Sequence, residues 1–272
     1  MSKKKWGQNF LKDKKVIESI IKAANIQINE SILEIGPGHG ILTKALLEKY
    51  ASVTSVEIDP KLCLNLKKRF GNEERFNLIE MDVMKIPPEE LSKLTPQPSK
   101  IVANLPYNIV SSLLLRILPV RKKWQSLTLM VQKEVAERIC ATSTSGKTYG
   151  PLSFVGELGF EREIIKIIPP EKFKPAPKVN SAIIRLFPKD SALNYEGEKL
   201  FLWWNQILFQ QRRKTLSNGI RQHFPEWYHS CGNSICKMFG MSRPENLSFD
   251  DWIRLFRNYL KNENLEYFEV KQ

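Results

Sequence analysis

Short apolar runs rich in β-branched residues recur along residues 31–187, and stretches with helical spacing separate them. Such runs, bounded by turn-forming residues, are typical of strands, and their alternation with helices is typical of a parallel sheet with crossover helices. Between the first two runs, apolar residues recur at the spacing of one buried helix face. The pattern therefore predicts an α/β fold that begins with a βαβ unit. The expected strands are Ser31–Ile35, Ser52–Ile58, Phe76–Asp82, Lys100–Asn104, Leu127–Gln132, Glu163–Ile168 and Ser181–Phe187.

The character of the chain changes near residue 188. Beyond it, aromatic and leucine-rich stretches with helical spacing lie around residues 200–211, 227–239 and 249–260. We therefore expect a domain boundary there, with residues 1–188 forming the sheet domain and residues 189–272 forming a smaller, all-helical C-terminal domain. The aromatic residues of the first helical stretch are expected in its core: Phe201, Trp203, Trp204 and Phe209.

A proline-rich stretch separates the last two expected strands. Pro169, Pro170, Pro175 and Pro177 exclude a helix interior, because proline lacks the backbone N–H and clashes with the preceding turn. We expect a fixed loop there that contributes to a functional site.

The composition, 42% hydrophobic and 26% charged, is that of a globular protein. No apolar run approaches the length of a membrane span or of a signal peptide, so we expect a cytoplasmic protein that does not enter the membrane. The net charge of +13 favours a polyanionic partner, and most of the excess lies in residues 1–187. The four cysteines form no CxxC pair, so we expect thiols rather than a disulfide or a metal site.

A glycine-rich turn follows the first expected strand and opens the first expected helix. Gly36, Gly38 and Gly40 would let the backbone pass close to a ligand, and Glu57, near the end of the second strand, could accept both hydroxyls of a ribose. The GxGxG spacing differs from the GxGxxG of dinucleotide sites, and Pro37 removes one N–H from a pyrophosphate cradle. S-adenosylmethionine therefore fits better than NAD. The alternative is a purely structural glycine turn.

Asp82 ends the third expected strand, where its carboxylate could accept a hydrogen bond from an adenine amino group. An isolated aspartate at such a position fits a helix cap better. Recognition of adenine by Asp82 is expected only if the glycine turn and Glu57 form a nucleoside site.

The fourth expected strand ends in Asn104-Leu105-Pro106-Tyr107, at the sheet edge where open α/β folds bind ligands. An exocyclic amine on a base is a poor nucleophile, because its lone pair is delocalised into the ring. The Asn104 side-chain oxygen and the Leu105 carbonyl could accept its hydrogens and direct the lone pair at a methyl sulfonium. Tyr107 could stack on an extruded base. A simple turn is the alternative.

Several motifs in a fixed order make the chain resemble the ribosomal RNA adenine N6,N6-dimethyltransferase family, specifically its bacterial small-subunit branch. The resemblance covers nearly the whole chain. Relatives that methylate large-subunit rRNA, and organellar transcription-factor relatives, share mainly the first half. The motifs are at residues 7–11, 34–40, 56–59, 104–109, 132–138, 149–153, 173–179 and 211–216.

The resemblance implies dimethylation of two adjacent adenosines near the 3′ end of 16S rRNA, coupled to biogenesis of the small subunit. It implies a Rossmann-like methyltransferase sheet and a monomer whose partners are 16S rRNA and the small-subunit precursor. Tyr107 and Phe173 would bracket the adenine. At His39 the chain departs from the residues that the family often has, and we expect a loop residue with no catalytic part, because methyl transfer from a sulfonium needs no base to begin. The residues implied to contact S-adenosylmethionine, including the second glycine of the turn, are Asn9, Leu11, Gly36, Gly38, Glu57, Asp82 and Asn104.

Basic clusters could contact RNA phosphates, but each one equally fits a solvated face. We expect RNA contact most at Arg212, Arg213 and Lys214. Other clusters lie at residues 3–5, 12–15 and 121–123. Two further functions stay open at this point, namely a non-catalytic ribosome-assembly factor that keeps the fold and an NAD-linked oxidoreductase, which the GxGxG spacing disfavours.

Overall fold

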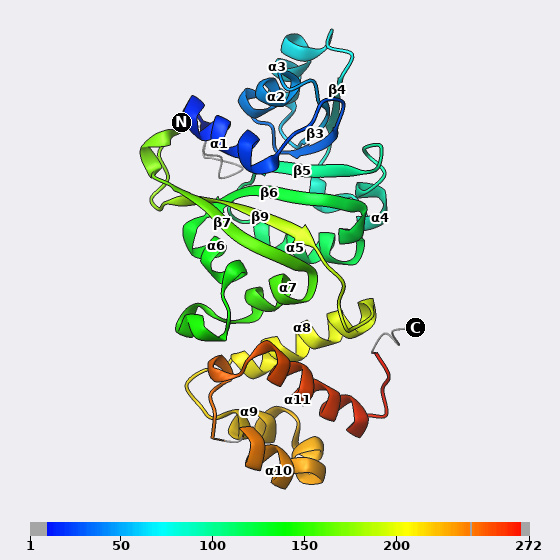
Figure 1. Cartoon of the computed structure of the whole chain (residues 1–272), viewed down its shortest axis with the longest axis vertical. Coiled ribbons are helices and arrows are strands. Elements are labelled where there is room, and N and C mark those ends of the chain that lie inside the picture. The colour runs from blue at the N-terminus through cyan, green and yellow to red at the C-terminus, as the bar shows by residue number, and fades with distance from the viewer. Residues whose placement is uncertain (1–9, 240, 268–272) are drawn as a thin grey trace. The chain divides into compact units, whose positions relative to one another are not determined.

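The computed structural model of the chain describes residues 10–239 and 241–267, and for residues 231–237 it describes the backbone alone (Figure 1). The chain forms two compact units. Residues 1–136 and 160–189 form the sheet unit, and residues 137–159 and 190–272 form the helical unit. The sequence placed residues 137–159 with the sheet, whereas their contacts group them with the later helices.

The described part of the sheet unit is built on a seven-stranded sheet with the order β4-β3-β2-β5-β6-β9-β7 (Figure 1). The strands from β4 to β6 run parallel, while β9 runs antiparallel to both of its neighbours. Each expected strand is confirmed to within a few residues, but the expectation of a wholly parallel sheet is wrong at this edge. The strands are β2 (Ser31–Ile35), β3 (Ser52–Glu57), β4 (Phe76–Glu80), β5 (Ser99–Asn104), β6 (Trp124–Gln132), β7 (Phe160–Ile168) and β9 (Ser181–Pro188).

Helices alternate with the parallel strands, as the periodicity predicts. Apolar residues of α1 and α2 form one core cluster with residues of β2, β3, β5 and β6, such as Ile32 and Val102. Successive strand residues point to opposite faces, so the intervening positions are buried on the other face, as at Leu33 and Ile101. The helices are α1 (Lys14–Ala24), α2 (Ile41–Leu47), α3 (Pro60–Phe70), α4 (Pro88–Leu91), α5 (Val110–Ile117) and α6 (Lys133–Cys140), the last of which crosses between the two units.

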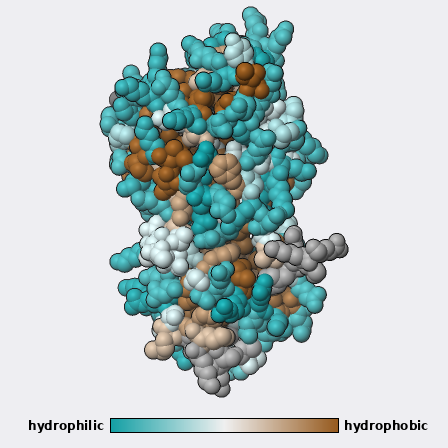
Figure 2. Space-filling model, in the orientation of Figure 1, coloured by the Kyte–Doolittle hydropathy of each residue, from teal (hydrophilic) through white to brown (hydrophobic). Residues whose placement is uncertain are grey.

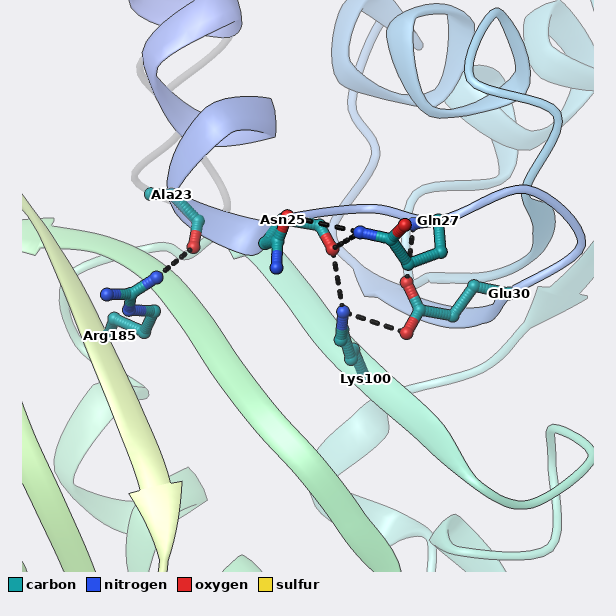
Figure 3. A network of polar contacts seen from close by, with 6 residues as sticks. All are labelled: Ala23, Asn25, Gln27, Glu30, Lys100 and Arg185. Carbon is teal, nitrogen blue, oxygen red and sulfur yellow. Dashed lines mark hydrogen bonds and ion pairs between the residues drawn. The ribbon is translucent and has the colours of Figure 1, made fainter.

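Two cations hold the C-terminal end of α1 against the sheet (Figure 3). Lys100 on β5 donates to the Asn25 carbonyl at 2.9 Å and pairs with Glu30 at 2.8 Å. Arg185 on β9 donates to the Ala23 carbonyl at 3.1 Å. The last carbonyls of a helix lack partners within the helix and carry its negative dipole end, so these cations satisfy them.

A two-stranded ribbon, which the sequence did not predict, joins the start of the described chain to the proline-rich loop. Strand β1 (Phe10–Leu11) pairs antiparallel with β8 (Phe173–Lys174). Leu11 and Phe173 are cross-strand partners and are both buried in the core cluster that includes α1. The ribbon thereby brings two motifs about 160 residues apart to the same side of the sheet.

The helical unit has an aromatic core. Phe201, Trp204 and Phe209 are buried as expected, whereas Trp203 is 50% exposed, so the expectation for this residue is wrong. The buried aromatic and leucine residues of this helix, at positions 201, 204, 208 and 209, recur at the spacing of one helix face, and Trp203 lies outside that face. The helices are α7 (Pro151–Gly159), α8 (Tyr195–Phe209), α9 (Leu216–His223), α10 (Pro225–Phe239) and α11 (Phe249–Asn262).

Most of the face shown in Figure 2 is hydrophilic, with apolar residues gathered in a few patches. Large apolar side chains on the surface include Ile164, Ile165 and Ile167 on β7. Among the described helices, none combines the length and the hydropathy that crossing a membrane requires.

Candidate active site

A cavity of about 690 Å³ lies where β2, β3, β4 and β5 end. Parallel strands place their carboxyl ends at one edge of the sheet, so the segments that follow them meet there. A volume of a few hundred cubic ångströms is typical of a small-molecule site. The lining contains most of the expected site residues: Leu11, Gly36, Gly38, Glu57, Asp82, Asn104, Leu105 and Tyr107.

The glycine turn after β2 needs its glycines for conformation and for space. Gly36 and Gly38 have φ angles of +68° and +58°, which side chains with a Cβ rarely adopt. A Cβ at Gly38 would also lie 3.2 Å from the Phe10 ring. A Cβ at Gly36 would lie 3.9 Å from the Asn104 carbonyl oxygen, so the turn runs beside the end of β5.

Glu57 is 3% exposed and holds this turn in place. Its Oε2 accepts from the Gly38 N–H at 3.1 Å, and its Oε1 accepts from the N–H groups of Ile58 and Asp59 at 2.9 and 3.0 Å. Burial raises the pKa of the carboxyl, and the three N–H donors act in the opposite direction. The carboxylate therefore shapes the cavity as well as lining it.

Glu34 is a second buried carboxyl in the lining, which the sequence reasoning did not single out. Its Oε2 accepts from Thr43 Oγ1 and Ser55 Oγ, each at 2.7 Å, while the buried Oε1 has no partner among the described residues. Burial raises its pKa to about 7. Its signal in the sequence is an acid inside an otherwise apolar strand, two residues before the glycine turn.

Asp82 follows β4 and lines the cavity. Its Oδ1 accepts from the Met84 N–H at 2.9 Å, so it caps the short 3-10 helix Val83–Lys85. Asp82 can therefore cap this helix and still accept a hydrogen bond from an adenine amino group, since the cap uses only one carboxylate oxygen. Adenine recognition by Asp82 stays a prediction.

The segment after β5 presents acceptors to the cavity. The Leu105 N–H donates to the Met130 carbonyl at 3.2 Å, and the Pro106 carbonyl accepts from Ile109 at 3.2 Å, so the turn is tied at both ends. Within the part of the chain that the structure describes, no group donates to the Asn104 side-chain oxygen or to the Leu105 carbonyl. These are the two oxygens that the sequence predicts as acceptors for an amino group.

Tyr107 lines the same cavity and is half-buried. Its hydroxyl lies 2.8 Å from the hydroxyl of Ser181, the first residue of β9. Burial raises the pKa of the phenol, and the bond to Ser181 opposes the shift. The sequence predicts that the aromatic face of Tyr107 stacks on a base, and the structure adds a contact at the hydroxyl.

An aromatic pair also borders the cavity. The rings of Phe10 and His39, which both line it, have centroids 4.2 Å apart. The His39 carbonyl accepts from Arg69 Nη1 at 2.8 Å. His39 is exposed and forms part of the wall next to the glycine turn, and its location fits the expected loop residue without a catalytic part.

Phe173 differs from the expected residues named above in that it does not line the cavity, although its cross-strand partner Leu11 does. It is 2% exposed in the core cluster behind the β1–β8 ribbon and is not in the cavity lining. Its stacking on a base stays a prediction and requires the side chain to leave this position. Asn9 and the lysines at residues 3–5 lie outside the described residues.

The basic clusters differ from one another in what they contact. Arg212 pairs with Glu245 at 3.0 Å and donates to the Tyr149 carbonyl at 3.0 Å, so it ties parts of the helical unit together. Arg213 and Lys214 are exposed. Arg121 is buried and donates to the Lys189 carbonyl at 3.1 Å. Contact with RNA is therefore easier to assign to Arg213 and Lys214 than to the two buried or paired arginines.

Comparison with known proteins agrees with this geometry. The sequence profile described as "Ribosomal RNA adenine dimethylase" matches residues 1–261. The chain belongs to this family. It is therefore an rRNA adenine dimethyltransferase, with S-adenosylmethionine as the methyl donor.

Methyltransferases of several bacteria are similar to this chain over almost its full length. The "Ribosomal RNA small subunit methyltransferase A" of Acaryochloris marina is 37% identical over 260 residues, covering 93% of this chain and 95% of that one. The protein of the same name from Fusobacterium nucleatum is also 37% identical, with coverage of 94% and 96%.

Two solved structures with 26% sequence identity share the fold. A dimethyladenosine transferase from Plasmodium falciparum has a TM-score of 0.74, with 96% of this chain and 100% of that one covered. The 23S rRNA methyltransferase ErmE has a TM-score of 0.67, with coverage of 92% and 99%. The Rossmann-like methyltransferase sheet and the helical C-terminal part are thus confirmed.

The cavity of this dimethylase suits S-adenosylmethionine. Its volume accommodates a nucleoside with an amino-acid tail, and the positive φ angles at Gly36 and Gly38 bring backbone rather than side chain to its wall. Carboxylates at Glu57 and Asp82 supply acceptors that suit ribose hydroxyls and an adenine amine. The parallel strands and the positive φ angles of the glycine turn are as the sequence predicts, and contact of this turn with the cofactor stays a prediction.

Proposed function

We propose that this enzyme dimethylates the N6 amino groups of two adjacent adenosines near the 3′ end of 16S rRNA during assembly of the small ribosomal subunit. The observation that carries the proposal is the pair of acceptors, Asn104 Oδ1 and the Leu105 carbonyl, which have no donor among the described residues at the edge of the cavity. The names of the bacterial relatives, which are similar over more than nine-tenths of the chain, support the small subunit as the substrate.

The two acceptors fit the chemistry of an adenine amine. An N6 nitrogen becomes nucleophilic only when its lone pair leaves conjugation with the ring. Hydrogen bonds from its two N–H groups to fixed acceptors favour that pyramidal geometry, and they matter most in the transition state. The backbone bonds on either side of Leu105 hold one acceptor in place before the substrate arrives.

Methyl transfer needs no general base to begin. S-adenosylmethionine supplies an electrophilic methyl group on a sulfonium. The attacked nitrogen becomes acidic and loses its proton to water afterwards, so His39 has no required catalytic part. Tyr107 would hold the extruded base by stacking, and the hydroxyl contact with Ser181 would keep its ring in place.

The helical unit would position the RNA, with Arg213 and Lys214 as its exposed cations. We propose that the enzyme acts as a monomer in the cytoplasm on a precursor of the small subunit. Light scattering on the purified protein would test the monomer, and a mass corresponding to two chains would contradict it.

Methyl transfer from tritiated S-adenosylmethionine tests the proposal on three substrates: small subunits lacking the modification, naked 16S rRNA and large subunits. Digestion to nucleosides should give labelled N6,N6-dimethyladenosine from the small subunits. Label in large subunits alone would favour the reaction named for ErmE. Tight binding to small subunits without any label would indicate an assembly factor that has lost catalysis.

A further inference from the structure

A single hydroxyl pair joins the base-binding segment to the antiparallel edge of the sheet. The Tyr107 hydroxyl lies 2.8 Å from Ser181 Oγ. Ser181 is fully buried and does not line the cavity, whereas Tyr107 is half-buried and does. One partner is therefore fixed in the interior, and the other stands where a substrate would be.

Ser181 is rigidly placed because its strand is paired on both sides. It lies opposite Gln132 of β6 and Ile168 of β7. The chain just before it is also held, since the Lys133 N–H donates to the Asn180 carbonyl at 2.9 Å. A hydroxyl at this position cannot follow a moving partner, so it can serve as an anchor.

Tyr107 needs such an anchor more than its neighbours do. It follows Pro106 in the short connection between β5 and α5, and it belongs to neither element. A tyrosine side chain has two rotatable bonds, and a hydrogen bond at its far end restricts both of them. The bond to Ser181 supplies that restraint at the hydroxyl, outside the ring itself.

We propose that Ser181 is a positioning residue for the target base, and that it acts by holding the Tyr107 ring in the orientation on which the base stacks. The proposal rests on the methyltransferase function proposed above. Ser181 is the first residue of β9, and the loop before it connects this strand to the β1–β8 ribbon.

Four variants and a matched control test the proposal, and one of the four, Tyr107→Ala, removes the ring itself. Ser181→Ala removes the anchor, Tyr107→Phe removes the hydroxyl but keeps the ring, and the double variant removes both. Ser99→Ala is the control, because Ser99 is also a fully buried serine with a hydroxyl partner, Thr95 Oγ1 at 3.0 Å, but it begins β5 at the end away from the cavity.

The first readout is single-turnover methylation of unmodified small subunits at saturating cofactor and enzyme. A net hydrogen bond of about 1 kcal/mol corresponds to a loss of roughly 3–10-fold. We expect Ser181→Ala and Tyr107→Phe to lose the same factor and the double variant to lose no more. Affinity for S-adenosylmethionine, measured by calorimetry, should stay unchanged in all of them, and Ser99→Ala should keep the full rate.

The second readout does not depend on which RNA is the natural substrate. A single-stranded oligoribonucleotide with one 2-aminopurine changes fluorescence when that base stacks on an aromatic ring. The unmodified protein should quench the probe, Tyr107→Ala should not, and Ser181→Ala should fall between them. Ser99→Ala should quench like the unmodified protein.

The outcomes separate this proposal from the proposed function. If small subunits receive no methyl groups but quenching follows the expected order, the substrate assignment fails and the role of Ser181 stands. The proposal is overturned if Ser181→Ala keeps both the full rate and full quenching. It is also overturned if the losses of the single variants multiply in the double variant, because each hydroxyl would then act on its own.

Discussion

The loop after β2 and the segment after β5 line one cavity, and they use their polar groups in opposite ways. In the first, the Gly38 N–H is bound within the protein, by Glu57. In the second, the Asn104 side-chain oxygen and the Leu105 carbonyl have no donor among the described residues. The comparison indicates that one loop is completed by folding and that the other is completed by substrate.

Changes in the loop completed by folding should lower stability, and changes in the segment completed by substrate should lower the rate. An unsatisfied buried N–H costs about 1–3 kcal/mol of folding free energy. An acceptor that is used only in the transition state costs nothing in the free protein when it is removed. The following substitutions separate these two kinds of effect.

The largest loss of methylation rate is expected for a substitution in the segment after β5. Asn104→Ala should lower the single-turnover methylation rate by roughly 100–1,000-fold, in line with the removal of one transition-state hydrogen-bond partner. Its melting temperature should stay close to that of the unmodified protein, since no described residue depends on the amide oxygen. Normal rates for both methyl additions would contradict the amine-orienting mechanism.

The next effect concerns pH and stability at Glu34. In the folded protein its pKa is about 7, against 4.5 for the free side chain, because burial disfavours the charge. The unfolded chain therefore binds fewer protons than the folded one between these values, and stability falls as pH rises through that window. The loss attributable to Glu34 should reach about 3 kcal/mol above pH 7.

Glu34→Gln tests this by removing the titration while keeping an acceptor for Thr43 and Ser55. Urea denaturation without cofactor gives the free energy of unfolding of both proteins. The value for the variant minus the value for the unmodified protein should increase steadily from pH 4.5 to pH 7. A difference that does not change with pH would show that Glu34 titrates normally.

Glu57 tests the loop after β2 itself. Glu57→Gln removes the charge and one acceptor oxygen, and it should weaken S-adenosylmethionine binding by roughly 10–100-fold, since a hydrogen bond to a charged group contributes about 1.5–3 kcal/mol. Glu57→Ala should also lower the melting temperature, because it leaves three N–H groups without their acceptor. Calorimetry and thermal unfolding separate the two losses, and unchanged cofactor affinity in both variants would remove Glu57 from the site.

The smallest effect is expected in the basic run of the helical unit. Replacing Arg213 and Lys214 by alanine should reduce the salt dependence of RNA binding by about 0.7–0.9 for each phosphate that is no longer neutralised, with stability unchanged. Arg212→Ala should instead lower stability, because it removes the ion pair with Glu245 and the hydrogen bond to the Tyr149 carbonyl.

A matched control for the double variant replaces Lys199 and Arg254, two exposed cations of the same unit whose acidic partners among the described residues lie on their own helices. The control removes the same charge and should keep the original salt slope. Equal slopes for both double variants would indicate that the basic run is a solvated helix face.

Much of the fold could be predicted from the hydrophobic pattern. The seven strands were recognisable because each is a short apolar run between turn-forming residues, and β2 was predicted with its observed bounds. The antiparallel direction of β9 was not predictable, since a buried strand has the same pattern in either direction. The β1–β8 ribbon was missed because two paired residues are too few to show a period.

The sequence by itself determined which candidate residues line the site. The glycine turn, Glu57, Asp82 and the segment Asn104–Tyr107 could all be located, because each directly follows or ends a recognisable strand and parallel strands end at one edge. The position of each residue relative to the nearest predicted strand was sufficient to locate it. Those residues therefore meet in the cavity as predicted.

Tertiary structure alone decided how those residues are held. The Glu34 partners, the bond between Tyr107 and Ser181, the burial of Phe173 and the ion pair of Arg212 all join residues at separations of 9 to 162 positions or place them against distant strands. The pattern of neighbouring residues in the sequence does not predict contacts between such distant positions. Whether a buried carboxyl is charged, or an arginine is available to RNA, depends on neighbours that only the folded chain supplies.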